Sequence, residues 1–272
     1  MIKQSIFQVD AFTSTLYTGN PAAVCPLEYW LDDTVMQLIA RENNLSETAF
    51  IVRDNKNYEI RWFTPNTEVD LCGHATLASA FVLFEVLGHQ EQTIVFNSKS
   101  GPLTVKKEED LLIMDFPGLG FTKVEPNAQL IEAIGLIPVE VYQSQFDMLC
   151  IFNDALSIRN AKPDLNALAA MSCRGIILSS PGVESDVYSR CFYPGCDVPE
   201  DPVTGSAHCV IAPYWCHRLN KKKIHARQGG NRQGELWCEM NQDRVILSGY
   251  SQLYLQGEIY VPVVQKEVVH DL

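Results

Sequence analysis

The segment RWFTP at residues 61–65 recurs as RCFYP at residues 190–194. Each copy of this R-x-F-x-P motif is followed by an acidic loop, a turn of small residues and an apolar stretch. The first copy continues into EVDLCGHA at 68–75 and the second into EDPVTGSA at 200–207. A duplication of this kind predicts two similar halves that face each other. The polar turn of each half would then point into one shared cleft, where we expect a ligand to bind.

The overall composition favours a soluble globular protein and argues against a nucleic-acid partner. Of the 272 residues, 46% are hydrophobic and 20% are charged, which is ordinary for a globular chain. A formal net charge of −12 opposes phosphate binding, which needs a basic face. The only basic run, at 221–223, is expected to be a solvated loop. No apolar run reaches the ~18 residues of a membrane span, and the N-terminal segment lacks the apolar core and cleavage site of a signal peptide.

The cysteine pattern predicts reduced thiols rather than disulfides or a zinc site. The chain contains nine cysteines, an odd number, and no C-x-x-C pair. The spacings of Cys191 to Cys196 and of Cys209 to Cys216 match no common zinc motif. Most of the cysteines lie in apolar segments. We therefore expect a cytoplasmic protein with no disulfide and no structural metal.

The two longest apolar segments predict a central helix in each half. Residues 73–87 are apolar almost all round, so a helix there must be buried on every side. A sheet wrapped around that helix would bury it. The counterpart at 205–219 contains Pro213, which is expected to kink the helix or cut it short.

The remaining elements predict an α+β fold in which strands predominate. Shorter helices are expected at 33–43 and 165–171. Strands are expected at 2–10, 49–53, 58–63, 93–97, 101–107, 111–116, 139–144, 150–152, 175–179, 186–192, 235–240, 244–248 and 252–261. Turn residues cluster at 117–120, so we place the two halves at 1–117 and 118–272. The last dozen or so residues could return to the first half.

The two small-residue turns predict an anion site. Gly73 and Gly205 each open a buried helix, whose N-terminus carries unpaired N–H groups and roughly half a positive charge. Glycine lets a ligand approach the backbone closely. Two such helix ends meeting across a cleft would bind a carboxylate or an oxyanion. The alternative is that both residues are simply glycines of tight turns.

Four side chains near these turns are candidates for acid–base chemistry: Glu47, Asp70, His74 and Asp201. Glu47 lies between a predicted helix and a predicted strand, among apolar and small residues, which suits a general acid or base. It could equally be a surface carboxylate, His74 a core histidine and Asp201 a helix cap.

Cys72 and Thr204 occupy matching positions in the two copies. A thiol at both positions would indicate a racemase with one base on each face of a stereocentre, but a threonine is not a usable base. The chain therefore lacks the pair of thiols that such a racemase needs.

Several segments together resemble the PhzF phenazine-biosynthesis family. They are GNPA at 19–22, SETAF at 46–50, RWFTP at 61–65, CGHAT at 72–76, EDPVTGSA at 200–207, SGY at 248–250 and GEI at 257–259. They occur in the order of the family and extend over most of the chain. Each segment alone would be weak, but the combination is specific.

The resemblance implies a diaminopimelate epimerase-like fold, with two pseudo-symmetric halves that are each a β-barrel-like sheet around a central helix. It also implies an isomerase that uses no cofactor and no metal, usually as a homodimer. In the family, the glutamate that matches Glu47 shuttles a proton between carbons of a carboxylated cyclic diene. His74, Asp201 and Ser206 match positions that line that site, and Gly73 and Gly205 match turns that supply backbone donors. Cys72 and Asn20 lie in the matching segments and are further candidates for substrate binding. The chain departs from the epimerase relatives at Thr204, where they carry a second cysteine, and from the phenazine enzyme at Cys72, where a small residue is usual.

These observations lead to one functional hypothesis and two alternatives. The hypothesis is a cofactor-independent isomerase that acts on a small cyclic carboxylate through Glu47, assisted by His74 and Asp201. The alternatives are a cysteine-assisted racemase or epimerase, and a protein that binds a small carboxylate without catalysis.

Overall fold

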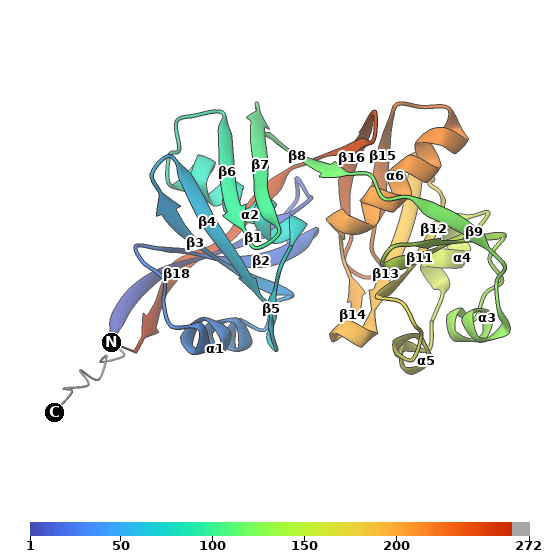
Figure 1. Ribbon diagram of the computed structural model, residues 1–272, viewed down its shortest axis with the longest axis horizontal. Helices are drawn as coiled ribbons and strands as arrows, with labels where there is room; N and C mark the ends of the chain where they lie inside the picture. The colour runs from blue at the N-terminus through green and yellow to red at the C-terminus, as the bar shows by residue number, and fades with distance from the viewer. Residues whose placement is uncertain (263–272) are drawn as a thin grey trace.

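Each half of the molecule is a curved sheet wrapped around one apolar helix (Figure 1). The computed structural model describes residues 1–262. The first half contains β1 (Ile2–Ala11), β2 (Asn20–Leu27), α1 (Asp33–Asn43), β3 (Glu47–Asp54), β4 (Asn57–Phe63), β5 (Glu68–Val69), α2 (Gly73–Phe81), η1 (Val82–Val86), β6 (Thr93–Ser98), β7 (Gly101–Glu108) and β8 (Leu111–Pro117).

The elements that follow form the second lobe, except for the last strand. They are β9 (Phe121–Val124), α3 (Ala128–Ile134), β10 (Glu140–Ser144), β11 (Asp147–Ile151), α4 (Ala155–Asn160), α5 (Leu165–Ala169), β12 (Gly175–Pro181), β13 (Val187–Tyr193), η2 (Pro194–Cys196), β14 (Val198–Asp201), α6 (Gly205–Leu219), β15 (Lys223–Gln228), β16 (Gly234–Asn241), β17 (Arg244–Gly249) and β18 (Ser251–Val261).

The strand pairings repeat from one half to the other. In the first half, β2 and β3 run parallel, β3–β4 and β4–β5 are antiparallel, β4 and β6 are parallel, and β6–β7–β8 is an antiparallel meander. The second half has the same series in β11–β12, β12–β13, β13–β14, β13–β15 and β15–β16–β17. The predicted pseudo-symmetric halves and α+β class are therefore confirmed, and the duplicated motif marks equivalent strands, β4 and β13.

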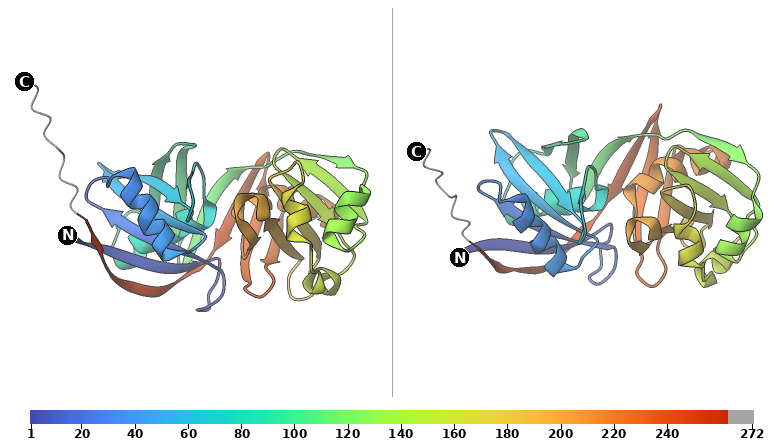
Figure 2. Two further views of the ribbon diagram at one scale, coloured as in Figure 1. Left: turned by 90° about the horizontal axis from the view of Figure 1, so that it is seen from below. Right: turned by 60° about the horizontal axis from the view of Figure 1, so that its bottom comes forward.

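The two halves are joined by strands that cross between them. β8 pairs with β17 where the lobes meet. The strand after β8 is β9, which pairs with β10 in the second lobe, and the strand after β17 is β18, which pairs with β1 in the first lobe (Figure 2). The division at residue 117 stays a prediction. Most of the terminal segment expected to return to the first half falls on residues 263–272, which lie outside the described residues.

The central helix of the first half is buried as predicted but changes its pitch. All residues of α2 from His74 to Ala80 are buried. The predicted single helix over 73–87 ends as α2 at Phe81, and η1 continues it as a π-helical turn in which the Leu87 N–H donates to the Val82 carbonyl at 2.9 Å. The segment is uniformly apolar, so its periodicity gives no sign of where the wider turn begins.

Pro213 does not shorten α6, which runs from Gly205 to Leu219. A proline inside a helix has no N–H and leaves the carbonyl four residues earlier without its partner. Here that carbonyl belongs to Cys209, and it accepts a hydrogen bond of 2.8 Å from the N–H of Leu119 instead. The segment that connects β8 to β9 thus satisfies the group that the proline leaves unpaired.

The arginine of each R-x-F-x-P motif anchors the strand that leads to the polar turn. Arg61 donates to both carboxylate oxygens of Glu68, at 2.7 and 2.9 Å, and Arg190 does the same to Glu200, at 2.7 Å for each bond. The Arg61 guanidinium lowers the pKa of Glu68 to about 2. The duplicated motif therefore holds β5 and β14 in place and does not itself contribute acid–base groups to the cavity.

Three further sequence expectations concern single features. The run at 221–223 is exposed, as expected, although its last residue already begins β15. All nine cysteines are free thiols. Within residues 1–262, no helix is both long and apolar enough to cross a membrane.

Candidate active site

A cavity of about 780 Å³ lies between the two halves and is lined by both polar turns. Gly73 and Gly205 meet in its wall, since a Cβ added to Gly73 would lie 3.7 Å from the Cα of Gly205. Neither glycine has a positive φ, so the backbone conformation does not require glycine at either position. The missing side chains instead leave the N-termini of α2 and α6 open to a ligand, which is the arrangement that favours an anion.

The first half contributes a chain of three polar groups to this cavity. Glu47 begins β3 and His74 is the second residue of α2, and they meet at 3.2 Å between Oε2 and Nε2. The other ring nitrogen of His74, Nδ1, lies 3.5 Å from the Cys72 sulfur. His74 Nε2 and Glu47 Oε2 are buried, yet within the described chain neither has a well-aligned hydrogen-bond partner. The contact of 3.2 Å between these two atoms is therefore the main polar interaction of each within the described chain.

The electrostatics of this chain raise the pKa of both the imidazole and the thiol. Burial lowers the pKa of His74, but Cys72 and Glu47 raise it by more, and the net pKa lies well above the usual value. Burial is the main cause that raises the pKa of the Cys72 thiol, and the nearby Glu47 adds to it. A thiol with a raised pKa is a poor base at neutral pH.

The same three residues are also spaced closely enough to be examined as metal ligands. One ligand atom from each of Glu47, Cys72 and His74 can be chosen within 4.8 Å of the others. The thiol, however, contacts Nδ1 and the carboxylate contacts Nε2. Opposite nitrogens of one imidazole cannot both ligate a single ion. The arrangement therefore fits a proton relay better than a metal centre.

Asp201 lines the cavity at the end of β14 and is only 8% exposed. It accepts hydrogen bonds from Asn20 Nδ2 at 2.7 Å and from Thr204 Oγ1 at 2.5 Å. Asn20 is fully buried and also donates to the Val203 carbonyl at 2.9 Å. It therefore orients Asp201 from behind, and it is absent from the described residues that line the cavity.

Burial raises the pKa of Asp201 to about 6, and Glu47 adds to this while His74 opposes it. As the pH rises from 3.8 towards 6, the unfolded chain ionises at Asp201 while the folded chain does not, so stability falls and stays lower above pH 6. We expect Asp201→Asn, which does not titrate, to gain about 2–3 kcal/mol of unfolding free energy relative to wild type between pH 4 and pH 7.5. Urea unfolding at both pH values measures this difference, with the exposed rim residue Asp197→Asn as control. If the difference in unfolding free energy between Asp201→Asn and wild type did not change with pH, it would contradict a raised pKa at Asp201.

The second half contributes an arginine that sequence reasoning missed. Arg174 lies just before β12, and its Nη2 is 3.2 Å from the Oγ of Ser206, the second residue of α6. Both residues line the cavity. Ser206 was a candidate, but Arg174 belongs to no motif and precedes an apolar strand. Asp70, another candidate, lines the cavity from an exposed position.

A comparison with protein families matches nearly the whole chain. The family model described as PhzC-PhzF, phenazine biosynthesis-like protein, matches residues 9–258. The chain belongs to the PhzC-PhzF family. An uncharacterized isomerase of Pseudomonas aeruginosa is 47% identical over 252 residues, covering 93% of this chain and 97% of that protein. An uncharacterized isomerase of Halalkalibacterium halodurans is 45% identical over 265 residues, covering 95% of this chain and 99% of the relative.

Solved structures confirm the fold of this PhzC-PhzF protein. The crystal structure of a PhzF-family phenazine biosynthesis protein from Enterococcus faecalis has a TM-score of 0.93 and 43% identity, covering 96% of this chain and all of that one. A probable proline racemase from Agrobacterium radiobacter shares the fold at a TM-score of 0.62 and 7% identity, covering 95% and 93% of the two chains. The expected resemblance to epimerase-like folds is thus confirmed.

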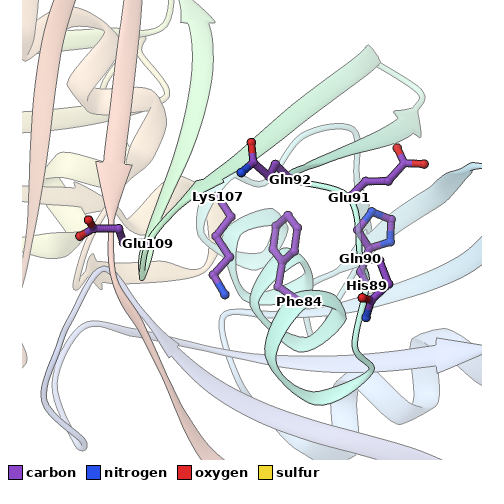
Figure 3. A pocket seen from close by; sticks show the side chains of 7 residues that line it. All are labelled: Phe84, His89, Gln90, Glu91, Gln92, Lys107 and Glu109. Carbon is purple, nitrogen blue, oxygen red and sulfur yellow. The ribbon is translucent and has the colours of Figure 1, made fainter.

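A second cavity of about 280 Å³ contains none of the candidate residues of this PhzC-PhzF protein. Figure 3 shows it between the end of the first central helix, the loop before β6 and strand β7. Its lining includes Phe84, His89 and Lys107, and Lys107 pairs with Glu85. Because both duplicated turns line the larger cavity and neither lines this one, we expect the chemistry in the larger cavity.

Proposed function

We propose that this protein is a cofactor-independent isomerase that moves a proton on a small, cyclic carboxylate, with Glu47 as the general acid and base. The observation that carries the proposal is the contact of 3.2 Å between Glu47 and His74 beside two abutting helix N-termini. The Pseudomonas and Halalkalibacterium relatives are both named as uncharacterized isomerases, which supports the same reaction class.

The proposed reaction uses the two helix ends and one base. The substrate carboxylate binds at the N–H groups around Gly73 and Gly205. Glu47 removes a proton from an adjacent C–H bond, and the electron pair moves into the conjugated system toward the carboxylate. The protonated Glu47 then returns the proton to another carbon, with His74 and Asp201 as neighbouring proton donors or acceptors. Stabilisation of the developing charge by the helix ends is the larger contribution, and the positioned base adds roughly 10²–10⁴-fold.

A wild-type isotope experiment tests this function. Small cyclic and aromatic carboxylates are screened by thermal shift, since a ligand at a hundredfold excess over its Kd stabilises the fold by about 2.7 kcal/mol. Each ligand found is then incubated with the protein in deuterium oxide. An isomerase incorporates deuterium at the exchanging carbon. Cyclic ligands that carry an acidic C–H bond and bind without any incorporation would instead indicate a binding protein without catalysis.

The racemase alternative requires Cys72 as a base, so Cys72→Ala discriminates it. We expect this variant to keep more than about a tenth of wild-type turnover, because the loss of a general base costs ~10² or more. The thiol has a raised pKa, and its counterpart is Thr204. Turnover of Cys209→Ala, another cavity thiol, is the matched control. If Cys72→Ala were inactive and Cys209→Ala were active, the racemase alternative would be favoured over the mechanism with Glu47 as the base.

A homodimer and a cytoplasmic location complete the proposal. Dimers are usual in the family that the chain resembles, and the free cysteines suit a reducing compartment. We propose no cofactor, no metal and no nucleic-acid or membrane partner.

A further inference from the structure

The large cavity has one cationic side chain of the arginine or lysine type among its described lining residues, and that residue is Arg174. Four acidic residues line the same cavity: Glu47, Asp70, Asp197 and Asp201. A negatively charged ligand in such a cavity needs a local positive charge, the more so in a chain with a net charge of −12. The imidazole of His74 also lines the cavity but already pairs with Glu47, so Arg174 is the group that can supply this charge to a ligand.

The guanidinium of Arg174 is held in place by several contacts, and one of its nitrogen atoms has no hydrogen-bond partner among the described residues. Its Nε and Nη2 donate to the two carboxylate oxygens of Asp147 at 2.9 and 2.5 Å, and Nη2 also reaches Ser206. Its charge lies 5.1 Å from the ring centre of Phe146 and 5.4 Å from that of Tyr193. Nη1 makes no hydrogen bond with the described residues. An arginine held by three of its contacts presents the remaining N–H groups in a defined direction.

A second donor on the same wall lacks a partner. Tyr193 lines the cavity, is 6% exposed and contacts the Arg174 guanidinium, and its hydroxyl is buried with no hydrogen bond among the described residues. Buried hydroxyl groups are costly when unpaired. Two unpaired donors on one cavity wall indicate that a ligand supplies the acceptor.

The cavity is therefore chemically asymmetric although its frame is pseudo-symmetric. The first half contributes Glu47 and His74, whereas the second half contributes Arg174 and Ser206 beside Asp201. We propose that Arg174 is the specificity-determining residue of this site. Its free Nη1 pairs with the substrate carboxylate at the second turn, which directs the exchangeable C–H toward Glu47. This inference rests on the proposed isomerase function and defines the substrate class as a ring carboxylate with its anionic group at the Arg174 end.

The test compares a charged probe with a neutral one of the same shape. Dissociation constants of benzoate and benzamide are measured by calorimetry or NMR titration for the full chain. Arg174→Met alone would leave the buried Asp147 unpaired, so the test uses the double variant Arg174→Met/Asp147→Asn, which keeps the net charge. The matched control is Arg232→Met/Asp10→Asn, because Arg232 is likewise about one-third exposed and pairs with a buried aspartate, at 2.6 Å, but does not line this cavity. Thermal unfolding verifies that both variants are folded.

Wild type is expected to bind benzoate at least about tenfold more tightly than benzamide, a difference of about 1.4 kcal/mol. The Arg174 double variant should reduce this preference to less than about threefold, while the control keeps it. A preserved preference in the Arg174 variant, or no preference in wild type, overturns the proposal. Deuterium exchange by wild type separates the role of Arg174 from the isomerase function. If wild type exchanges the substrate proton but the Arg174 variant still prefers benzoate, only the role of Arg174 is wrong. If the Arg174 variant loses the preference for benzoate but wild type exchanges no proton of any bound carboxylate that carries an acidic C–H bond, only the isomerase function is wrong.

Discussion

Replacement of Glu47 by glutamine is expected to lower turnover by at least ~10²-fold while the fold stays intact. Glutamine has nearly the same shape as glutamate and can still hydrogen-bond, but it cannot accept and return a proton. The carboxylate of the ligand is held by the helix ends and not by Glu47, so affinity should change by about 1.5–3 kcal/mol at most, the worth of one charged hydrogen bond. Turnover and calorimetric binding are measured with the carboxylate that the screen identifies.

The structure offers a matched control for this substitution. Glu235 contacts Nε2 of His225 at 3.1 Å, almost the distance between Glu47 and His74, but it lies outside the cavity. Glu235→Gln removes the same charge from the same kind of pair and should leave turnover unchanged. If both variants lost activity equally, the loss would reflect altered stability or net charge and not a missing base.

The second large effect is expected in stability, from Arg190→Met. The Arg190 side chain is mostly buried and bonds Glu200 as well as the carbonyls of Ile158 and Ala161, at 3.0 and 2.8 Å. Methionine fills part of the space but leaves all of these acceptors without their donor. Breaking a buried charged pair costs about 3–5 kcal/mol, and we expect the lower end because Glu200 is partly exposed.

Urea unfolding measures this cost, with Arg218→Met as the control. Arg218 pairs with Glu140 at 2.8 Å but is far more exposed, so its loss should cost less than about 1 kcal/mol. Similar losses in both variants would mean that the arginine of the duplicated motif is not the structural anchor inferred here.

The sequence predicts the frame of the molecule because the duplication is a local pattern. Two copies of R-x-F-x-P, each before a glycine turn and an apolar helix, imply two halves and one shared cleft. Gly73, Gly205, Glu47, His74 and Asp201 do line that cleft. Their chemical roles stay predictions.

What the sequence could not provide depends on contacts between distant segments. The exchange of β9 and β18 between the halves has no local signal, because a strand sequence does not state which sheet it joins. The segment that forms β2 contains Pro21 and Pro26, which argue against a strand. Arg174 is one arginine before an apolar strand, and only the fold brings it to Ser206. The carbonyl of Cys209, which Pro213 leaves without its helical partner, accepts from the N–H of Leu119, and Leu119 lies in a distant segment.

The central claim is that Glu47 carries the proton, and deuterium incorporation tests it most directly. Wild type and Glu47→Gln are incubated in deuterium oxide with the same saturating carboxylate, and the ligand is analysed by mass spectrometry over time. We predict that wild type gains one deuterium at the exchanging carbon and that the variant, though it binds the ligand, gains at least ~10²-fold less in the same period. Equal incorporation by the two proteins would contradict the claim and transfer the role to Asp201 or His74.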